Sequence, residues 1–462
     1  MPVEEAAAKC VADPTRFWTL SCLCVVAILS SATSVVQASP PEYLSHRGPW
    51  VESPEHANTP IDALWRPSIR PGPEPGATAW SWLTDAELKV QIRSYYLERD
   101  RDGEADSLAW ALGGSVEYRS GLWRDRVGLG ATFYTSQPLY APTEKPGSGL
   151  LAPVQDGYSV LGESYLLARP FGTSYLKLWR QGLQLPYINE DDVRMTPITF
   201  EAYVLFDKDS KRFNYILGYV DKMKNQTETT WQAMSDAAGA AGSNRGVSVL
   251  GALFKLGERA RVGAINQYGH DTFNTLYIES GGSTDLGGDQ GLQLHGSLQY
   301  TNQASVGQAL IGSFNTWQVG AKVDIGSEQQ KLTLAYTDTG AGAAIQTPWG
   351  GTPSYNSVIV EDFDRAAERA WRIGAAFDLS RFGLDSISGF VNYVAGDTPD
   401  RGRNASPDQD ELDLTLDWKP KGGRLQGLWL RARVASINAA GTGAVDQVDY
   451  RLILNYDFSP RL

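Results

Sequence analysis

In the segment Leu428-Trp-Leu-Arg-Ala-Arg-Val434, aliphatic residues alternate with one tryptophan and two arginines. In a strand with a period of two, its leucine, alanine and valine side chains share one face, and Arg431 and Arg433 share the other. An arginine that faces lipid in the middle of a membrane costs about 2–4 kcal/mol. If this strand crosses a membrane, both arginines must therefore point away from the lipid.

The same alternation recurs from Leu88 to the C-terminal end of the sequence. Its apolar faces include Leu88, Val90 and Ile92; Val127, Leu129, Ala131 and Phe133; Trp317, Val319, Ala321, Val323 and Ile325; Trp371, Ile373, Ala375 and Phe377; and Val448, Tyr450, Leu452, Leu454, Tyr456 and Phe458. About 18 such segments can be counted, each close to the ~9–11 residues that a tilted membrane strand needs. Since only closure removes sheet edges from hydrocarbon, we expect an all-β fold, a closed antiparallel transmembrane β-barrel over residues 87–462.

The connections between these segments alternate in length. Short turns fall at 121–125, 170–173, 208–211, 257–258, 327–328, 381–385 and 419–427, and longer loops at 135–157, 181–197, 223–245, 338–365 and 396–409. Outer-membrane barrels show this asymmetry between their two ends, whereas a soluble sandwich has no reason to sort its loops. Residues 281–291 look long for the short-turn side and the loop near His270 looks short, so the strand count could change by two there.

The polar segment 184–200 contains Pro186 and Pro197 and is predicted to be neither strand nor helix. Tyr175, Lys177 and Trp179 lead into it, and an alternating apolar segment from Phe200 follows it. A long loop between strands is usually functional or disordered. We expect this loop to narrow a pore.

Residues 1–38 differ from the rest. Arg16 precedes an apolar run at 17–29, and Ala38 ends a small-residue cleavage site, which together are typical of a cleaved secretory signal peptide. An uncleaved anchor is the weaker alternative, because the apolar run is short. All three cysteines lie in this leader, so the exported chain would have no disulfide. Residues 39–86 are rich in proline and form an N-terminal extension, either a periplasmic or lumenal segment or a disordered linker.

The composition of the chain limits the kinds of partner and ligand that we expect. The chain has 462 residues and a net charge of −12 without a large basic patch, which argues against nucleic acid. Four histidines without a cluster support no metal centre, and we expect no cofactor and no enzymatic activity. The partners we expect are small polar solutes, outer-membrane lipids and lipopolysaccharide, with the barrel a monomer or a weak trimer in the outer membrane.

Strand parity also sorts the charged residues. On the face opposite the apolar one lie the cations Arg93, Lys177, Lys322, Lys331, Arg372, Arg431, Arg433 and Arg451 and the acids Asp324, Glu368, Asp413, Asp417, Asp449 and Asp457. Arg431 and Arg433 are two residues apart, so they form a positive strip that would attract an anionic solute in a narrow lumen. The alternative is that acids of the next strands, such as Asp417 or Asp449, pair with them.

The chain resembles the OprD family of substrate-specific outer-membrane porins from about Leu88 to the C-terminus. The resemblance is carried by Ile92-Arg-Ser-Tyr-Tyr-Leu-Glu-Arg99, Asp191-Asp-Val-Arg-Met-Thr-Pro-Ile-Thr-Phe200, Leu428-Trp-Leu-Arg-Ala-Arg433 and Asn455-Tyr-Asp-Phe458. It implies a monomeric barrel of 18 strands, a third long loop folded into the lumen, and passive uptake of amino acids, other small carboxylates or chito-oligosaccharides past a ladder of basic wall residues. The loop pattern Asp192-x-Arg194-x-x-Pro197 makes Arg194 a residue of the eyelet, facing Arg431 and Arg433.

The sequence departs from this family in its acids. Asp410-Glu-Leu-Asp413 stands where members often carry a further arginine, and Asn392-Tyr393 stands where they often have Arg-Tyr. With Glu190, Asp191 and Asp192 just before Arg194, the eyelet is expected to be mixed in charge.

Two other functions stay open at this point. His295 and Ser297 have the i, i+2 spacing of outer-membrane phospholipases, where histidine activates a serine nucleophile, but no third orienting residue is identifiable. A structural or adhesin barrel would lack an inward constriction. Within the channel class, the 14 tryptophans leave room for a sugar-binding aromatic track, with Trp429 beside Arg431 as the local hint.

Overall fold

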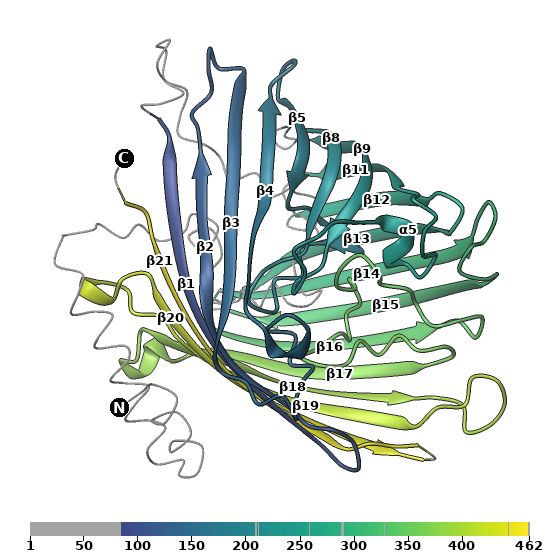
Figure 1. The fold of residues 1–462 in the computed structure, drawn as a ribbon. Coiled ribbons are helices and arrows are strands. Elements are labelled where there is room, and N and C mark those ends of the chain that lie inside the picture. The colour runs from purple at the N-terminus through teal and green to yellow at the C-terminus, as the bar shows by residue number, and fades with distance from the viewer. Residues whose placement is uncertain are drawn as a thin grey trace.

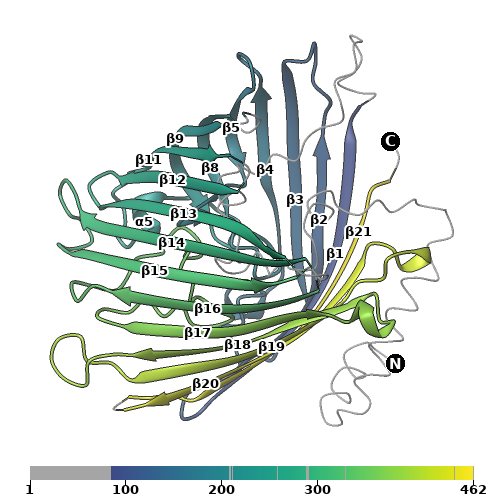
Figure 2. The same ribbon diagram turned by 180° about the vertical axis from the view of Figure 1, so that it is seen from behind.

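The computed structural model describes residues 85–460 except 208–209, 211, 258, 288–290, 328 and 442. One antiparallel sheet of 19 strands contains the two-residue strand β10, which pairs with β9, and 18 longer strands. The last strand pairs with the first, so the 18 strands close into a barrel (Figures 1 and 2). The predicted fold class and strand number are confirmed. The signal peptide and nearly all of the N-terminal extension lie outside the described residues.

The barrel strands are β1 (Glu87–Arg101), β2 (Ser107–Arg119), β3 (Val127–Tyr140), β4 (Tyr158–Ala168), β5 (Ser174–Gln181), β8 (Thr199–Asp207), β9 (Phe213–Lys224), β11 (Val247–Leu256), β12 (Ala260–Gly269), β13 (Phe273–Gly287), β14 (Leu292–Ser305), β15 (Asn315–Gly326), β16 (Gln330–Thr339), β17 (Arg369–Asp378), β18 (Ile387–Asp397), β19 (Asp408–Trp418), β20 (Leu428–Ala440) and β21 (Gln447–Phe458). The connections hold β6 (Gln184–Leu185), β7 (Ile188–Asn189), β10 (Gln232–Ala233), α5 (Met234–Ala237), η1 (Pro153–Gln155), η2 (Leu379–Phe382) and η3 (Gly423–Leu425). Among the described residues, no helix is long and apolar enough to cross a membrane.

Burial alternates along the strands as the period of two predicts. In β15, Trp317 and Val323 are exposed while Gln318 and Lys322 are buried. The exposed set of the barrel is dominated by large apolar side chains, and the buried set contains most of the inward cations and acids expected from parity. The outer face is therefore apolar, and the interior is rich in polar groups.

Two predicted connections differ from the structure. Strand β13 continues to Gly287 and β14 begins at Leu292, so most of the segment 281–291 is strand and the apparent long turn is not one. The glycines and small polar residues of this stretch imitate a loop in sequence, but they pair across the sheet with β14. The strand count therefore does not change by two. Strand β3 also continues to Tyr140, so it includes the first six residues of the predicted loop that starts at Thr135.

The prediction that residues 184–200 contain no strand is wrong at two points. Strands β6 and β7 form a small hairpin, and β8 already begins at Thr199. Pro186 and Tyr187 make the turn of the hairpin, and Tyr187 has φ of 61°. Proline followed by a residue with positive φ is the signature of a type II turn, so the proline promotes this hairpin rather than preventing it.

Strand β5 breaks the simple alternation before this segment. Lys177 is buried inside the barrel, whereas Trp179 is exposed, although the two are two positions apart and a regular strand would place them on one face. Trp179 has φ of 87°, so the backbone is distorted there and the side chain changes face. The parity of Tyr175, Lys177 and Trp179 could not be extended through this point from sequence alone.

One side of the interior is apolar. The inward residues of β8, β9 and β11 to β13 pack with the segment 183–198, with Met234 of α5 and with Trp349 in one buried cluster: Leu183, Leu185, Tyr187, Ile188, Ile198, Phe200, Ala202, Val204, Phe206, Ile216, Val220, Met223, Met234, Val247, Val249, Leu253, Ile265, Phe273, Tyr277, Ile345 and Trp349. Such an apolar inward face exists only because another part of the chain covers it.

Candidate functional site

The segment 183–198, which we call the first loop segment, is tied to β1 by an ion pair. Arg93 donates to both carboxylate oxygens of Asp192, at 2.7 and 3.0 Å, and its Nη1 also donates to the carbonyl of Arg194. Its Nε donates to Asn455 of β21 at 2.9 Å. The geometry makes the predicted pathway residue Arg93 a bridge between the barrel wall and the loop.

The same segment also contacts strands from another part of the barrel. The hydroxyl of Tyr187 lies 2.7 Å from that of Thr301 in β14. The side-chain amide of Gln267 in β12 donates to the carbonyl of Pro186. Strands β12 and β14 are not neighbours of β1, so the first loop segment joins non-adjacent parts of the wall.

A second segment, residues 345–364, meets the first one. The amide of Asn189 donates to the carbonyl of Gly351 at 2.8 Å and accepts from its N–H at 2.9 Å. Gly350 has φ of 144°, and a Cβ there would lie 2.7 Å from the amide oxygen of Asn189. Trp349 donates to the carbonyl of Met234 at 2.8 Å. Sequence reasoning missed this second loop segment. The length of the loop 338–365 was its only signal.

The predicted arginines of β20 and β21 lie side by side. Arg433 and Arg451 are register partners, and each is only 3% exposed. Arg451 donates to Asp449 at 3.2 and 2.7 Å, and Arg99 donates to the same carboxylate at 3.0 and 2.9 Å. Arg433 donates from Nε to the hydroxyl of Thr415 at 3.1 Å. One carboxylate thus serves two guanidinium groups.

Arg431 follows the alternative in which an acid pairs with it. Its Nε and Nη2 donate to the two oxygens of Asp417 on β19, each at 2.8 Å. Trp429 donates to the same carboxylate at 2.7 Å, and its ring lies 4.6 Å from the Arg431 guanidinium and 4.1 Å from the Lys419 ammonium. Two cations therefore already lie against the ring that was the local hint of a sugar track.

Arg194 lies with the arginines of the wall. Burial lowers its pKa, and the positive charge of Arg451 lowers it further. Gly149 of the preceding long loop has a positive φ, and a Cβ there would lie 2.9 Å from Nε of Arg194. The charge of Arg451 thus acts on Arg194, and Arg451 is the register partner of Arg433. That Arg194 faces Arg431 and Arg433 across the opening stays a prediction.

Two predicted cations lie elsewhere. Lys177 is fully buried, with its ammonium 3.9 Å from the ring of Tyr165 and 4.0 Å from a carboxylate oxygen of Glu163. Arg372 donates to the side chain of Asn392 at 3.2 and 2.8 Å and to the carbonyl of Tyr355 at 3.2 Å. Both sit in polar networks that bind the wall together or to the second loop segment.

Both loop segments carry buried acidic groups. Burial raises the pKa of Asp191 to about 6, with Arg194 opposing the shift and Asp362 adding to it. Burial also raises the pKa of Asp362 to about 6. The negative charge of Asp362, in the second loop segment, thus contributes to the raised pKa of Asp191 in the first.

His295 and Ser297 lie on the inner face of β14, with Nε2 and Oγ 3.1 Å apart. Asp324 is the register partner of His295 on β15, a neighbour that sequence spacing did not reveal. Strand β14 is paired on both sides, with β13 and with β15. Its backbone N–H groups are thus committed to the sheet, which leaves no donors next to the serine for an oxyanion. Within the described residues, no group of His, Cys, Asp or Glu is placed to hold a metal ion.

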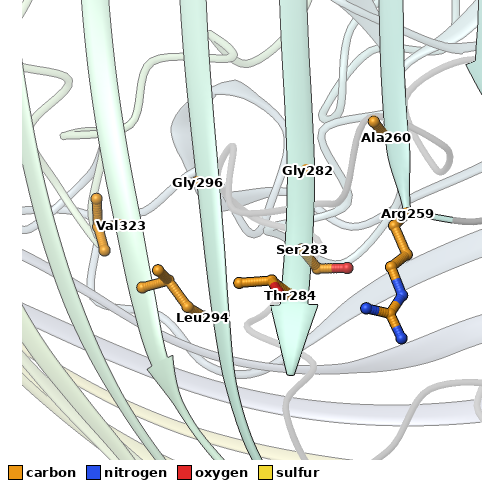
Figure 3. Close-up of a pocket in the computed structure, with 8 residues that line it drawn as sticks. All are labelled: Arg259, Ala260, Gly282, Ser283, Thr284, Leu294, Gly296 and Val323. Atoms are coloured by element: carbon orange, nitrogen blue, oxygen red, sulfur yellow. The ribbon is translucent and has the colours of Figure 1, made fainter. Parts of the chain in front are cut away.

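A groove of about 330 Å³ lies on β12 to β15, away from these charges (Figure 3). Gly282 and Gly296 are register partners at its floor, and Ala260, Leu294 and Val323 border it, together with Arg259, Ser283 and Thr284. Val323 is on the exposed face of β15, opposite to buried Lys322. The groove therefore opens on the apolar outside of the barrel and has no access to the arginine cluster.

A closed barrel of 18 strands with an apolar outer face and a charged interior is the architecture of an outer-membrane channel. The comparisons with known proteins agree. The chain belongs to the OprD family of outer membrane porins, whose model matches residues 81–460. The resemblance seen in the sequence is thereby confirmed, and outer-membrane location follows from the family and the fold.

Relatives and solved structures fall in the same class. Porin D of Pseudomonas aeruginosa is 23% identical over 421 residues, covering 83% of this chain and 93% of the relative. The porin-like protein GalP of Pseudomonas putida is 22% identical over 410 residues, covering 83% and 94%. The structure of OccK9 (OpdG) from Pseudomonas aeruginosa superposes with a TM-score of 0.75 at 22% identity, covering 82% of this chain and all of that one. A BenF-like porin from Pseudomonas fluorescens Pf-5 gives 0.73 at 18%, with the same coverage.

Proposed function

We propose that this porin passes small polar solutes by passive diffusion and favours carboxylates, amino acids among them. The path runs beside the two loop segments and past Arg194, Arg433 and Arg451. The supporting observations are the register pair of Arg433 and Arg451 on the wall and the effect of the Arg451 charge on Arg194 of the loop. A carboxylate is matched in charge and geometry to guanidinium groups, which can bind it with two parallel hydrogen bonds.

The balance of charges at the cluster favours an anion. Asp449 accepts from both Arg99 and Arg451, so a single negative charge faces two positive ones. Nη1 of Arg451 is buried and has no hydrogen-bond partner among the described residues. A buried donor without a partner is costly, so a water molecule or a passing carboxylate oxygen would be stabilised there.

The two loop segments form the constriction in this proposal. The first one connects β1 with β12 and β14, and the clamp of Asn189 on Gly351 fixes the second one to it. Asp191 and Asp362 add carboxyl groups beside Arg194. An amino acid would fit this mixed opening, with its carboxylate toward the arginines and its ammonium group toward the acids.

The test removes the charge of Arg194 by an Arg194→Gln substitution. A unit charge about 7 Å from the path changes the energy of an anion and of a cation by about 0.6 kcal/mol each, in opposite directions, so the permeability ratio of anions to cations should fall roughly sevenfold. Reversal potentials in planar bilayers, with acetate, glutamate and lysine as probes, measure this ratio. The proposal of carboxylate preference fails if the ratio stays constant.

Arg369→Gln is the matched control for this test. It removes the same charge from a side chain that is 67% exposed and lies next to Asp338. By parity Arg369 belongs to the outer face of β17, so the selectivity of the channel should not change. No specific observation supports the two alternative functions. The strands around Ser297 are paired, which disfavours a lipid hydrolase, and cations lie against the ring of Trp429, which disfavours a sugar track.

A further inference from the structure

The acids of β19 that replace an expected arginine contact the second loop segment. Glu411 and Asp413 lie on the inner face of β19, and both are fully buried. The N–H of Val360 donates to one carboxylate oxygen of Glu411 at 2.9 Å, and the N–H of Glu361 donates to the other at 2.8 Å. Two successive backbone N–H groups thus bind the Glu411 carboxylate, in the way that an anion-binding turn binds an anion.

Two more contacts fix the same short stretch. The N–H of Ile359 donates to Asp413 at 3.4 Å. The side-chain amide of Gln409, also on β19, donates to the carboxylate of Glu361 at 2.8 Å. Three side chains from alternate positions of one strand therefore bind residues 359–361, so this stretch follows the wall of the barrel.

The stretch that Glu411 holds lies directly on Arg451. The carbonyl of Ile359 accepts from Nη2 of Arg451 at 3.1 Å. The side chain of Ile359 packs against Ala435 and Ile437, on the strand that carries Arg433. The carbonyl of Ile359 therefore occupies one donor that a carboxylate of the solute would need.

We propose that Glu411 is a positioning residue that sets the selectivity of the channel. It holds residues 359–361 against Arg451, the register partner of Arg433, and so limits how much of the Arg451 charge the solute meets. Asp413 assists it through Ile359. This proposal rests on the proposed function, since it assumes that these arginines line the path. It also explains why acids stand where the family often has a further arginine: they do not face the solute but bind the loop.

The first test is the substitution Glu411→Gln. Glutamine has the same shape but presents an NH₂ group to one of the two backbone N–H groups, so one of the two hydrogen bonds is lost. The hydrogen bond between Ile359 and Arg451 should then be broken for a larger fraction of the time. We expect a larger single-channel conductance and an anion-to-cation permeability ratio raised by up to roughly sevenfold, which is the effect of one further unit charge reaching the path.

Asp410→Asn is the matched control. Asp410 is the adjacent residue of β19, it accepts from Asn438 at 3.0 Å, and the described contacts of residues 359–361 do not include it. The substitution makes the same chemical change one residue away. If both variants shift the ratio equally, the effect is one of charge alone and the positioning role is wrong. An unchanged ratio in Glu411→Gln contradicts it as well.

A second measurement separates positioning from a general loosening of the protein. In an Arg451→Gln background, Glu411→Gln should no longer raise the ratio, because its effect depends on exposing that guanidinium. A shift of undiminished size in this background overturns the proposal. If Glu411→Gln does not fold, Asp413→Asn replaces it, with a smaller rise in the same direction. A wild-type protein that conducts no ions would refute the proposed function itself, before either variant is compared.

Discussion

The two sides of the barrel interior are built differently. On the side of β8 to β13, inward Phe, Val, Ile and Met side chains pack with the first loop segment and Trp349 into a core that resembles that of a soluble protein. On the side of β19 to β21 and β1, the inward side chains are arginines and acids, and the second loop segment reaches them through hydrogen bonds. The difference shows how one barrel can hold its loop segments by apolar packing on one side and by hydrogen bonds to charged side chains on the other.

The largest effect should come from breaking the packed side with Phe200→Ala. Phe200 is fully buried in the apolar cluster, and removal of a buried phenyl ring costs about 3–5 kcal/mol of unfolding free energy. The loss should also free the first loop segment, so channel noise should increase. Guanidinium unfolding in detergent micelles, followed by tryptophan fluorescence, measures the stability.

Leu217→Ala serves as the control for this prediction. Leu217 lies on the outer face of β9 and is 53% exposed, so its truncation removes contact with lipid rather than packing. Its effect on unfolding should be clearly smaller, and its channel noise should match that of the wild type. Equal losses in the two variants would contradict the view that this side of the interior is a true core.

An effect of intermediate size is expected when a change of pH titrates Asp191 and Asp362 of the two loop segments and thereby alters the ion selectivity. Burial raises the pKa of Asp191 to about 6 and that of Asp362 to about 6, whereas the arginines stay charged. As the pH falls from 8 to 5, the opening loses negative charge, and the anion-to-cation permeability ratio should rise about three- to tenfold with a midpoint near 6. Reversal potentials recorded across this range test the expectation. In the double variant Asp191→Asn with Asp362→Asn, the curve should be flat. A curve that keeps its midpoint in that variant assigns the titration to other groups.

The raised pKa of Asp191 also determines the direction in which its contribution to folding stability changes with pH. An unfolded aspartate titrates near about 3.9, so a folded value raised to about 6 means that the folded protein binds more protons between these two pH values. The contribution of Asp191 to stability is therefore largest in acid and is lost as the pH rises through about 6. This is the reverse of the usual behaviour of an ion-paired aspartate.

The strands and their inward charges could be predicted from the sequence because both depend on a period of two. Lipid on the outside decides which face of a strand is apolar, so Arg431 and Arg433 were placed inside before any contact was known. This logic does not assign a face in β8. Phe200 and Phe206 alternate as a lipid-facing set would, yet they are buried inside, because the first loop segment covers them. A period of two defines two faces but does not say what covers each.

The site could be predicted only in part, because several of its contacts join residues that are far apart in the sequence. A short local pattern singled out Arg194, and the charge of Arg451 lowers its pKa, whereas its role at the opening stays a prediction. The contacts of residues 359–361 with Glu411 join positions some 50 apart, and no local pattern announces them. Whether Asp417 pairs with Arg431 depends on the register of β19 and β20, which the turn between them sets. The carboxylate preference and the inward path of the loops stay predictions until transport is measured.

The smallest effect should follow from replacing the pair of Arg431 and Asp417 by the neutral pair Arg431→Gln with Asp417→Asn. The two side chains are buried and bound to each other by two hydrogen bonds, so their charges largely cancel toward the path. Exchange of a buried ion pair for neutral groups of similar shape is often nearly neutral in stability, within about 1 kcal/mol. We therefore expect little change in the unfolding midpoint and in the reversal potential. Arg433→Gln alone, two residues along the same strand, should shift the reversal potential toward cations. If the paired replacement shifts it as much as Arg433→Gln does, then Arg431 faces the solute, and the charged side of the barrel is a continuous strip rather than a short cluster around Arg194, Arg433 and Arg451.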